Sequence, residues 1–73
     1  MPLIQVKVIE NVFIPAQKSQ IITKLTDAMV SIEGENTRPV TLVLIEEVRS
    51  GEWGIGGRAM TTDAVHALAA GKK

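Results

Sequence analysis

The sequence predicts an α/β chain, which can equally be described as α+β, in which one helix connects two parallel strands and a short hairpin follows. Three segments support this β-α-β prediction: an alternating segment at residues 3–9, an amphipathic segment at residues 15–33 and an apolar run at residues 40–45. These spacings are typical of a strand, a helix and a buried strand. In this order they favour parallel strands joined by a right-handed crossover.

The first predicted strand covers Leu3–Ile9, where β-branched residues alternate between two faces. Pro2 precedes this strand, at a position where the missing N–H removes little from a strand ladder. Pro15 suits the first turn of the helix, and Gly34 suits its C-terminal end. The apolar stripe of this helix consists of Ile21, Ile22, Leu25, Ala28, Met29 and Ile32.

The second half of the chain contains shorter elements. A polar loop is expected at Glu35–Pro39, followed by a strand at Val40–Ile45 that is buried on both faces. The glycines of Gly51–Gly57 indicate a tight hairpin. Thr61 or Thr62 is expected to cap a short terminal helix.

The length and composition predict a single domain that associates with other subunits. The chain has 73 residues, so one domain over residues 1–73 is expected. A chain of this length buries only about 60% of the surface that its unfolded form exposes. Yet 45% of its residues are hydrophobic, and it has no cysteine with which to form disulfides. These properties predict that apolar surface is shared between subunits of a larger oligomer.

The charge pattern excludes several classes of partner. The formal net charge is zero, aromatic residues make up 3%, and no long run of Lys and Arg is present, so we expect no nucleic acid partner. No apolar stretch approaches the roughly 20 residues of a membrane span, and the start of the sequence lacks the pattern of a signal peptide. We therefore expect a cytoplasmic protein without a membrane partner.

Pro2 is the most reactive candidate in the sequence. A small second residue permits removal of Met1, which converts the Pro2 nitrogen into a basic secondary amine. An α-amino group titrates near about 7.7–8.0, and apolar surroundings or a nearby cation lower that pKa. Such a base suits the removal of a proton next to a carbonyl group. The alternative is a proline that only starts a strand.

Trp53 is the only tryptophan, and it stands among glycines. Its ring either packs in the core or a subunit interface, or it forms the wall of a pocket in which the glycines leave room for a ligand.

His66 is the only histidine, and no cysteine or second histidine accompanies it as a metal ligand. We therefore expect no metal site.

Three segments together resemble the 4-oxalocrotonate tautomerase family: Met1–Glu10, the helix opening at Gln17 and Lys18, and Trp53–Gly57. The resemblance covers almost the whole chain in order and length. It implies a tautomerase-like β-α-β subunit that assembles into a hexamer, a trimer of dimers. It also implies an isomerase that uses neither a metal nor an organic cofactor and in which Pro2 is the general base.

The resemblance also implies which residues surround a small-molecule substrate. Trp53 stands at the family's aromatic pocket position. Leu3 and Ile9 match its apolar pocket wall. Val12 and Phe13, in the loop after the first strand, are expected to make the pocket mouth apolar.

Two arginines that bind substrate in the family have no counterpart in this sequence. Leu42 stands where one arginine is expected, and residues 11–14 replace the region of the other. A bidentate arginine–carboxylate contact is strong and directional, so an apolar residue does not replace it. Arg38 or Arg49 is the candidate for a displaced cation, and a solvated surface arginine is the alternative for each.

The sequence supports three hypotheses about function. The first is a tautomerase that moves a proton in a small 2-hydroxydienoate or 2-oxo acid, with Pro2 as the base. The second is a proline-dependent hydratase or decarboxylase of small unsaturated acids, which needs a carboxylate to activate water. The third is a non-catalytic partner subunit that works with an arginine-bearing paralogue, and the missing arginines motivate it.

Overall fold

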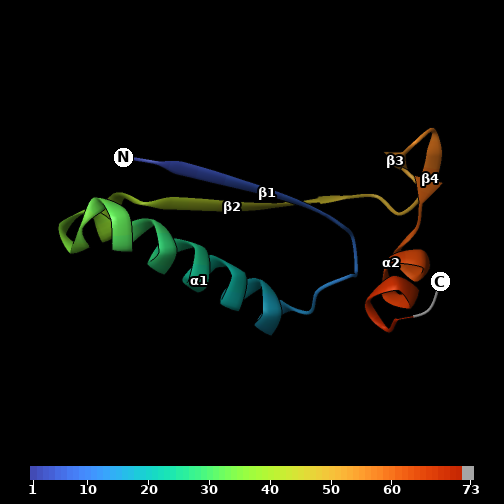
Figure 1. Cartoon of the computed structure of the whole chain (residues 1–73), viewed down its shortest axis with the longest axis horizontal. Coiled ribbons are helices and arrows are strands. Elements are labelled where there is room, and N and C mark those ends of the chain that lie inside the picture. The colour runs from blue at the N-terminus through green and yellow to red at the C-terminus, as the bar shows by residue number, and fades with distance from the viewer. Residues whose placement is uncertain (72–73) are drawn as a thin grey trace.

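The computed structural model describes residues 1–71, which form an elongated chain of 43 × 22 × 19 Å (Figure 1). The β-α-β order and the C-terminal hairpin confirm the fold class predicted from the sequence. The elements are β1 (Leu3–Ile9), α1 (Pro15–Glu33), the 3-10 helix η1 (Glu35–Val40), β2 (Leu42–Val48), β3 (Trp53–Ile55), β4 (Arg58–Met60) and α2 (Thr62–Ala69).

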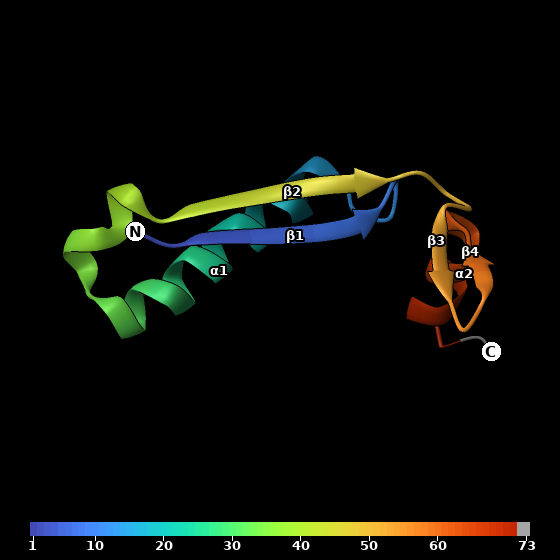
Figure 2. The same ribbon diagram turned by 90° about the horizontal axis from the view of Figure 1, so that it is seen from above.

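β1 and β2 form a two-stranded parallel sheet, paired from Leu3 opposite Leu42 to Ile9 opposite Val48. α1 covers one face of this sheet, as both views show (Figures 1 and 2). Within the chain, Ile9 and Val30 are the buried core residues, with 6% and 5% of their surfaces exposed. The core of the single subunit is therefore small.

The start and end of α1 agree with the sequence prediction. Pro15 is its first residue, and the side chain of Gln17 accepts a hydrogen bond from the Ile14 backbone N–H at 3.0 Å. Gly34 ends the helix with a positive φ of 106°, and its N–H donates to the Val30 carbonyl at 2.8 Å. This conformation favours glycine.

The predicted apolar stripe of α1 is partly wrong. Ile21, Leu25 and Met29 are half-buried as expected. Ile32 is instead 84% exposed, while Val30, which lies outside the predicted stripe, is buried. The contact face shifts toward Val30 at the C-terminal end of the helix, and the narrow two-stranded sheet cannot cover the remaining apolar positions.

The segment between α1 and β2 also differs from the expected polar loop. It forms the 3-10 helix η1, which contains Pro39 and ends at Val40. The Thr37 side chain donates to the Gly34 carbonyl at 2.6 Å, and the Arg38 guanidinium donates to the Glu35 carboxylate at 2.7 Å. These local contacts stabilise one helical turn, so β2 begins two residues later than predicted.

The second face of the sheet carries apolar side chains that no element between residues 1 and 71 covers. The sequence predicted that the second strand is buried on both faces, but Leu42 and Leu44 of β2 are exposed here, as is Leu3 of β1. Lys7 and Glu46 lie opposite each other on the same face. We call this surface, formed by Leu3, Gln5, Lys7, Leu42, Leu44 and Glu46, the open face of the sheet.

The hairpin and the terminal helix follow the predicted turn and capping chemistry. Gly56 and Gly57 both have positive φ angles, 58° and 83°, as the tight turn between β3 and β4 requires. The Thr61 hydroxyl accepts a hydrogen bond from the Ala64 N–H at 3.1 Å, so Thr61 rather than Thr62 caps α2.

No helix between residues 1 and 71 has the length and apolar character needed to cross a membrane.

The open face predicts association between copies, which Leu44→Glu tests. Leu44 is 48% exposed, and a charge there would be buried without a partner in any assembly that covers this face. We expect the wild type to sediment as an oligomer at micromolar concentration and Leu44→Glu to sediment as a smaller species.

Ile22→Glu is the matched control for this experiment, because Ile22 is 42% exposed but lies on α1. It should leave the sedimentation coefficient unchanged. Dissociation by Ile22→Glu alone would place the interface on the helix and contradict the prediction.

Candidate functional site

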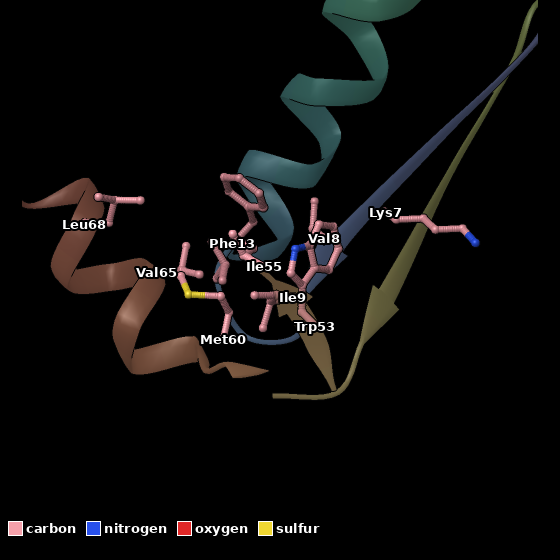
Figure 3. A pocket seen from close by; sticks show the side chains of 10 residues that line it. Lys7, Val8, Ile9, Phe13, Trp53, Ile55, Met60, Val65 and Leu68 are labelled. Atoms are coloured by element: carbon pink, nitrogen blue, oxygen red, sulfur yellow. The ribbon is translucent and has the colours of Figure 1, made fainter. Parts of the chain in front are cut away.

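An apolar cavity of about 260 Å³ lies at the C-terminal end of β1 (Figure 3). The end of β1, the loop that follows it, the hairpin and α2 all contribute to its wall. Lys7 also borders the cavity, but its ammonium group points away from the other lining side chains in Figure 3. The apolar lining includes Val8, Ile9, Phe13, Trp53, Met60 and Leu68.

Trp53 reaches this cavity because hydrogen bonds attach the hairpin to the end of the sheet. Trp53 pairs with Met60 across the two short strands, and the Gly51 N–H donates to the Met60 carbonyl at 2.8 Å. The Glu10 carboxylate, directly after β1, accepts a hydrogen bond from the Ser50 N–H at 3.1 Å. The tryptophan ring therefore lines the cavity, and its contact with a ligand stays a prediction.

The loop after β1 is held by both of its neighbouring elements. Asn11 has a positive φ of 61°, which asparagine tolerates better than most residues. Its N–H donates to the Glu47 carboxylate at 3.3 Å, and its carbonyl oxygen lies 3.0 Å from Nε2 of His66. His66 thus links α2 to this loop.

Glu47 also forms an ion pair with Lys18 of α1 at 3.0 Å. The Lys18 ammonium and, secondarily, the Asn11 N–H hold the pKa of Glu47 below its usual value. Both donors favour the charged carboxylate. The cluster fixes the loop that carries Val12 and Phe13 into the cavity wall.

Pro2 lies at the opposite end of β1. It is half-buried, and its carbonyl accepts a hydrogen bond from the Leu42 N–H at 3.0 Å. Leu3 and Leu42, two of the predicted pocket residues, pair next to it on the open face. Pro2 therefore directly precedes β1, whose first residue, Leu3, lies on the open face.

The predicted site residues fall into two groups within one chain. Pro2, Leu3 and Leu42 lie at the N-terminal end of β1, whereas Ile9 and Trp53 lie at the cavity. β1 has seven residues, and at about 3.3 Å per residue its ends lie about 20 Å apart. Figures 1 and 2 show the N-terminus and the hairpin at opposite ends of the chain. A single subunit does not bring Pro2 to Trp53.

Arg38 is engaged by two carboxylates. Its guanidinium lies 2.7 Å from Glu35 and 2.7 Å from Asp27, and these bonds raise its pKa above the usual value. A substrate carboxylate at Arg38 has to compete with both partners. Arg49 is exposed and forms no ion pair with any residue in the described range 1–71.

The cavity includes residues that the sequence did not indicate as site residues. Ile55 and Met60 come from the hairpin, and Val65 and Leu68 come from α2. The three-residue spacing of Val65 and Leu68 is typical of one face of a helix, but it does not show which element that face meets.

Among the residues described, no group of three His, Cys, Asp or Glu side chains is placed to hold a metal ion.

The sequence of the chain is similar to those of known proteins. The model of the tautomerase enzyme family matches residues 2–63. A curated probable tautomerase of Dickeya dadantii is 34% identical over 61 residues, which cover 84% of this chain and 90% of that protein.

Solved structures have the same architecture. TomN, a 4-oxalocrotonate tautomerase homologue in the tomaymycin biosynthetic pathway, is 26% identical with a TM-score of 0.73 and matches 93% of this chain and 95% of its own. A structure from work on the 4-oxalocrotonate tautomerase isozymes of Methylibium petroleiphilum is 31% identical, with a TM-score of 0.70, and the match covers 88% and 97% of the two chains. DmpI from Helicobacter pylori is 29% identical with a TM-score of 0.69, over 89% and 98%.

The Glu47 cluster predicts a stability that depends on pH. The pKa of Glu47 is lower in the folded chain than its usual value of 4.5. Its stabilising contribution is therefore complete above that value and is lost as the pH falls through the lowered pKa. We expect Glu47→Gln to lower the Tm by a few degrees at pH 7, and we expect this difference to shrink at acid pH.

Thermal unfolding followed by circular dichroism at neutral and acid pH measures this effect. Glu46→Gln is the control, because Glu46 forms no ion pair with the residues that the structure describes. An equal loss of Tm in both variants would contradict a specific role of the Lys18–Glu47 pair.

Proposed function

The chain belongs to the tautomerase enzyme family and is an isomerase of the 4-oxalocrotonate tautomerase type, and we propose that Pro2 is its general base. This membership confirms the resemblance read from the sequence. The proposed reaction is the transfer of a proton between oxygen and carbon in a small 2-hydroxydienoate or 2-oxo acid. We propose that it takes place in the cytoplasm and uses no cofactor.

The observation that supports this role best is the position of Pro2. The hydrogen bond from the Leu42 N–H to the Pro2 carbonyl fixes the residue that directly precedes β1. The ring is half-buried at the start of β1, and desolvation lowers the pKa of an amine. Once Met1 is removed, the Pro2 nitrogen is a secondary amine held in one orientation.

The proposed site is completed by a second copy of the chain. Pro2 and the cavity lie about 20 Å apart, at the two ends of β1. If a two-fold axis relates two sheets with opposite strand directions, the N-terminus of one copy lies at the cavity end of its neighbour. The exposed leucines of the open face supply the apolar contact area for further association. We propose a hexamer, a trimer of dimers, as the complete enzyme.

The proposed reaction needs only one proton carrier. The Pro2 nitrogen accepts the proton of the enol hydroxyl group, and the electrons of that O–H bond form the carbonyl double bond. The electrons of the carbon–carbon double bond then take the proton from Pro2 at carbon. The base returns to its starting state, and no atom is gained or lost. The apolar lining around Trp53 excludes water that would compete for the proton.

Among residues 1–71, the lack of an unpaired arginine beside Pro2 favours a second candidate function. Leu42 is apolar, and the guanidinium of Arg38 is bound by Asp27 and Glu35. A partner subunit with arginines would supply the missing carboxylate contacts. The chain would then serve as the non-catalytic half of a mixed oligomer, and turnover would appear only after mixing with an arginine-bearing paralogue.

The role of Pro2 is tested with two synthetic chains that differ only in the presence of Met1. The chain that begins at Pro2 should ketonise phenylenolpyruvate, and the chain that keeps Met1 should not, because its Pro2 nitrogen is an amide. Pro2→Ala should lower kcat about 10²–10⁴-fold, the usual contribution of a general base.

The intact mass of the protein from cells should show that Met1 is absent. Equal ketonisation by both synthetic chains would overturn the proposal. Activity that requires an added paralogue would support the partner-subunit function instead.

A further inference from the structure

We propose that α2 is part of the ligand site and that Val65 and Leu68 select substrates with an apolar side chain, either aryl or branched alkyl. This inference rests on the proposed tautomerase function and adds the class of substrate. Both residues line the cavity together with Trp53 (Figure 3). They lie beyond the family match, which ends at residue 63, the second residue of α2.

α2 is fixed against the end of β1 by hydrogen bonds from its first and second turns. The Thr62 hydroxyl donates to the Glu10 carbonyl at 2.6 Å, and the Thr62 N–H donates to the Ser50 hydroxyl at 2.9 Å. One turn later, Nε2 of His66 lies 3.0 Å from the Asn11 carbonyl oxygen. These contacts span the helix segment that carries Val65, so its side chain is held at the cavity.

Leu68 lies at the rim rather than in the core. It lines the cavity, yet 65% of its surface is exposed in the chain. A side chain in this position loses exposed apolar area when a ligand binds next to it, and this burial favours binding. Leu68 is therefore available to a ligand and is not needed to fill the interior of the subunit.

The chemistry of the cavity determines which ligand fits. Its volume is about 260 Å³, and an apolar protein cavity of about 150 Å³ already holds benzene. Among residues 1–71, Lys7 is the cation that borders the cavity, and its ammonium group points away. A second carboxylate placed among these side chains would therefore lose its hydration without gaining that cation. The cavity therefore favours the apolar end of a monocarboxylic 2-oxo acid over a dicarboxylate.

Kinetics with two enol substrates test this selectivity. We expect Leu68→Ala to lower kcat/KM for phenylenolpyruvate about ten-fold and to change kcat/KM for the enol of 2-oxobutanoate little, because the shorter chain does not reach α2. Val65→Phe, which fills the cavity, should likewise affect only the aryl substrate. Ala64→Leu adds bulk at an exposed position of α2 that does not line the cavity, and it should leave both values unchanged.

A binding measurement separates this inference from the proposed function. Trp53 is the only tryptophan, so its fluorescence reports occupancy of the cavity. We expect 3-phenylpropanoate, which cannot tautomerise, to change the emission saturably, and we expect Leu68→Ala to weaken its binding about ten-fold. This result does not depend on Pro2.

The outcomes distinguish the two proposals. If the Pro2 variants keep full activity while 3-phenylpropanoate still binds and Leu68→Ala weakens that binding, the general-base role of Pro2 is refuted. The proposed ligand site at α2 then stands. The role of α2 would be overturned if the wild type turns over both enols and Leu68→Ala lowers kcat/KM equally for both. It would also be overturned if 3-phenylpropanoate does not change the fluorescence of Trp53.

Discussion

The structure depends on the parallel pairing of β1 and β2, a sheet of two strands that has a helix on only one face. Two strands with one covered face bury too little apolar surface to be stable alone. Here the single chain buries Ile9 and Val30 and leaves Leu3, Leu42 and Leu44 exposed. The uncovered face is therefore as characteristic of the fold as the covered one, and it is the reason why we propose that another copy of the chain completes the core.

Hydrogen bonds at the end of β1 hold the hairpin and α2 in place. Glu10 binds the Ser50 N–H and, through its carbonyl, the Thr62 hydroxyl. Asn11 binds Glu47 and His66. Two consecutive residues thus attach β2, the hairpin and α2 to one point, and the cavity forms where these elements meet. Local backbone geometry at Asn11, rather than a large core, positions the pocket.

The sequence predicts those parts of the fold that depend on local chemistry. The alternation of Leu3–Ile9, the paired glycines at the hairpin and a threonine cap at Thr61 or Thr62 all have short-range causes. The structure agrees with them and selects Thr61 as the cap. The 3-10 turn at Glu35–Val40 was missed because it depends on side-chain contacts of Thr37 and Arg38 that no periodic pattern reveals.

The candidate site was harder to predict than the fold. Pro2 and Trp53 were identified as separate motifs, but the seven-residue strand between Pro2 and the cavity keeps them apart in one subunit. Val65 and Leu68 reach the cavity because of hydrogen bonds between residues 52 and 55 positions apart in the chain. Contacts of that range have no signature in local spacing.

The length of β1 sets the distance between Pro2 and the cavity. Adding one residue would move every later side chain of the strand to the other face of the sheet. Adding two would restore the faces but shift the proline by about 7 Å, and β2 would need the same extension to keep its register. The two central strands can therefore change in sequence but not in length, whereas the hairpin and α2 depend on the contacts that place them at the cavity.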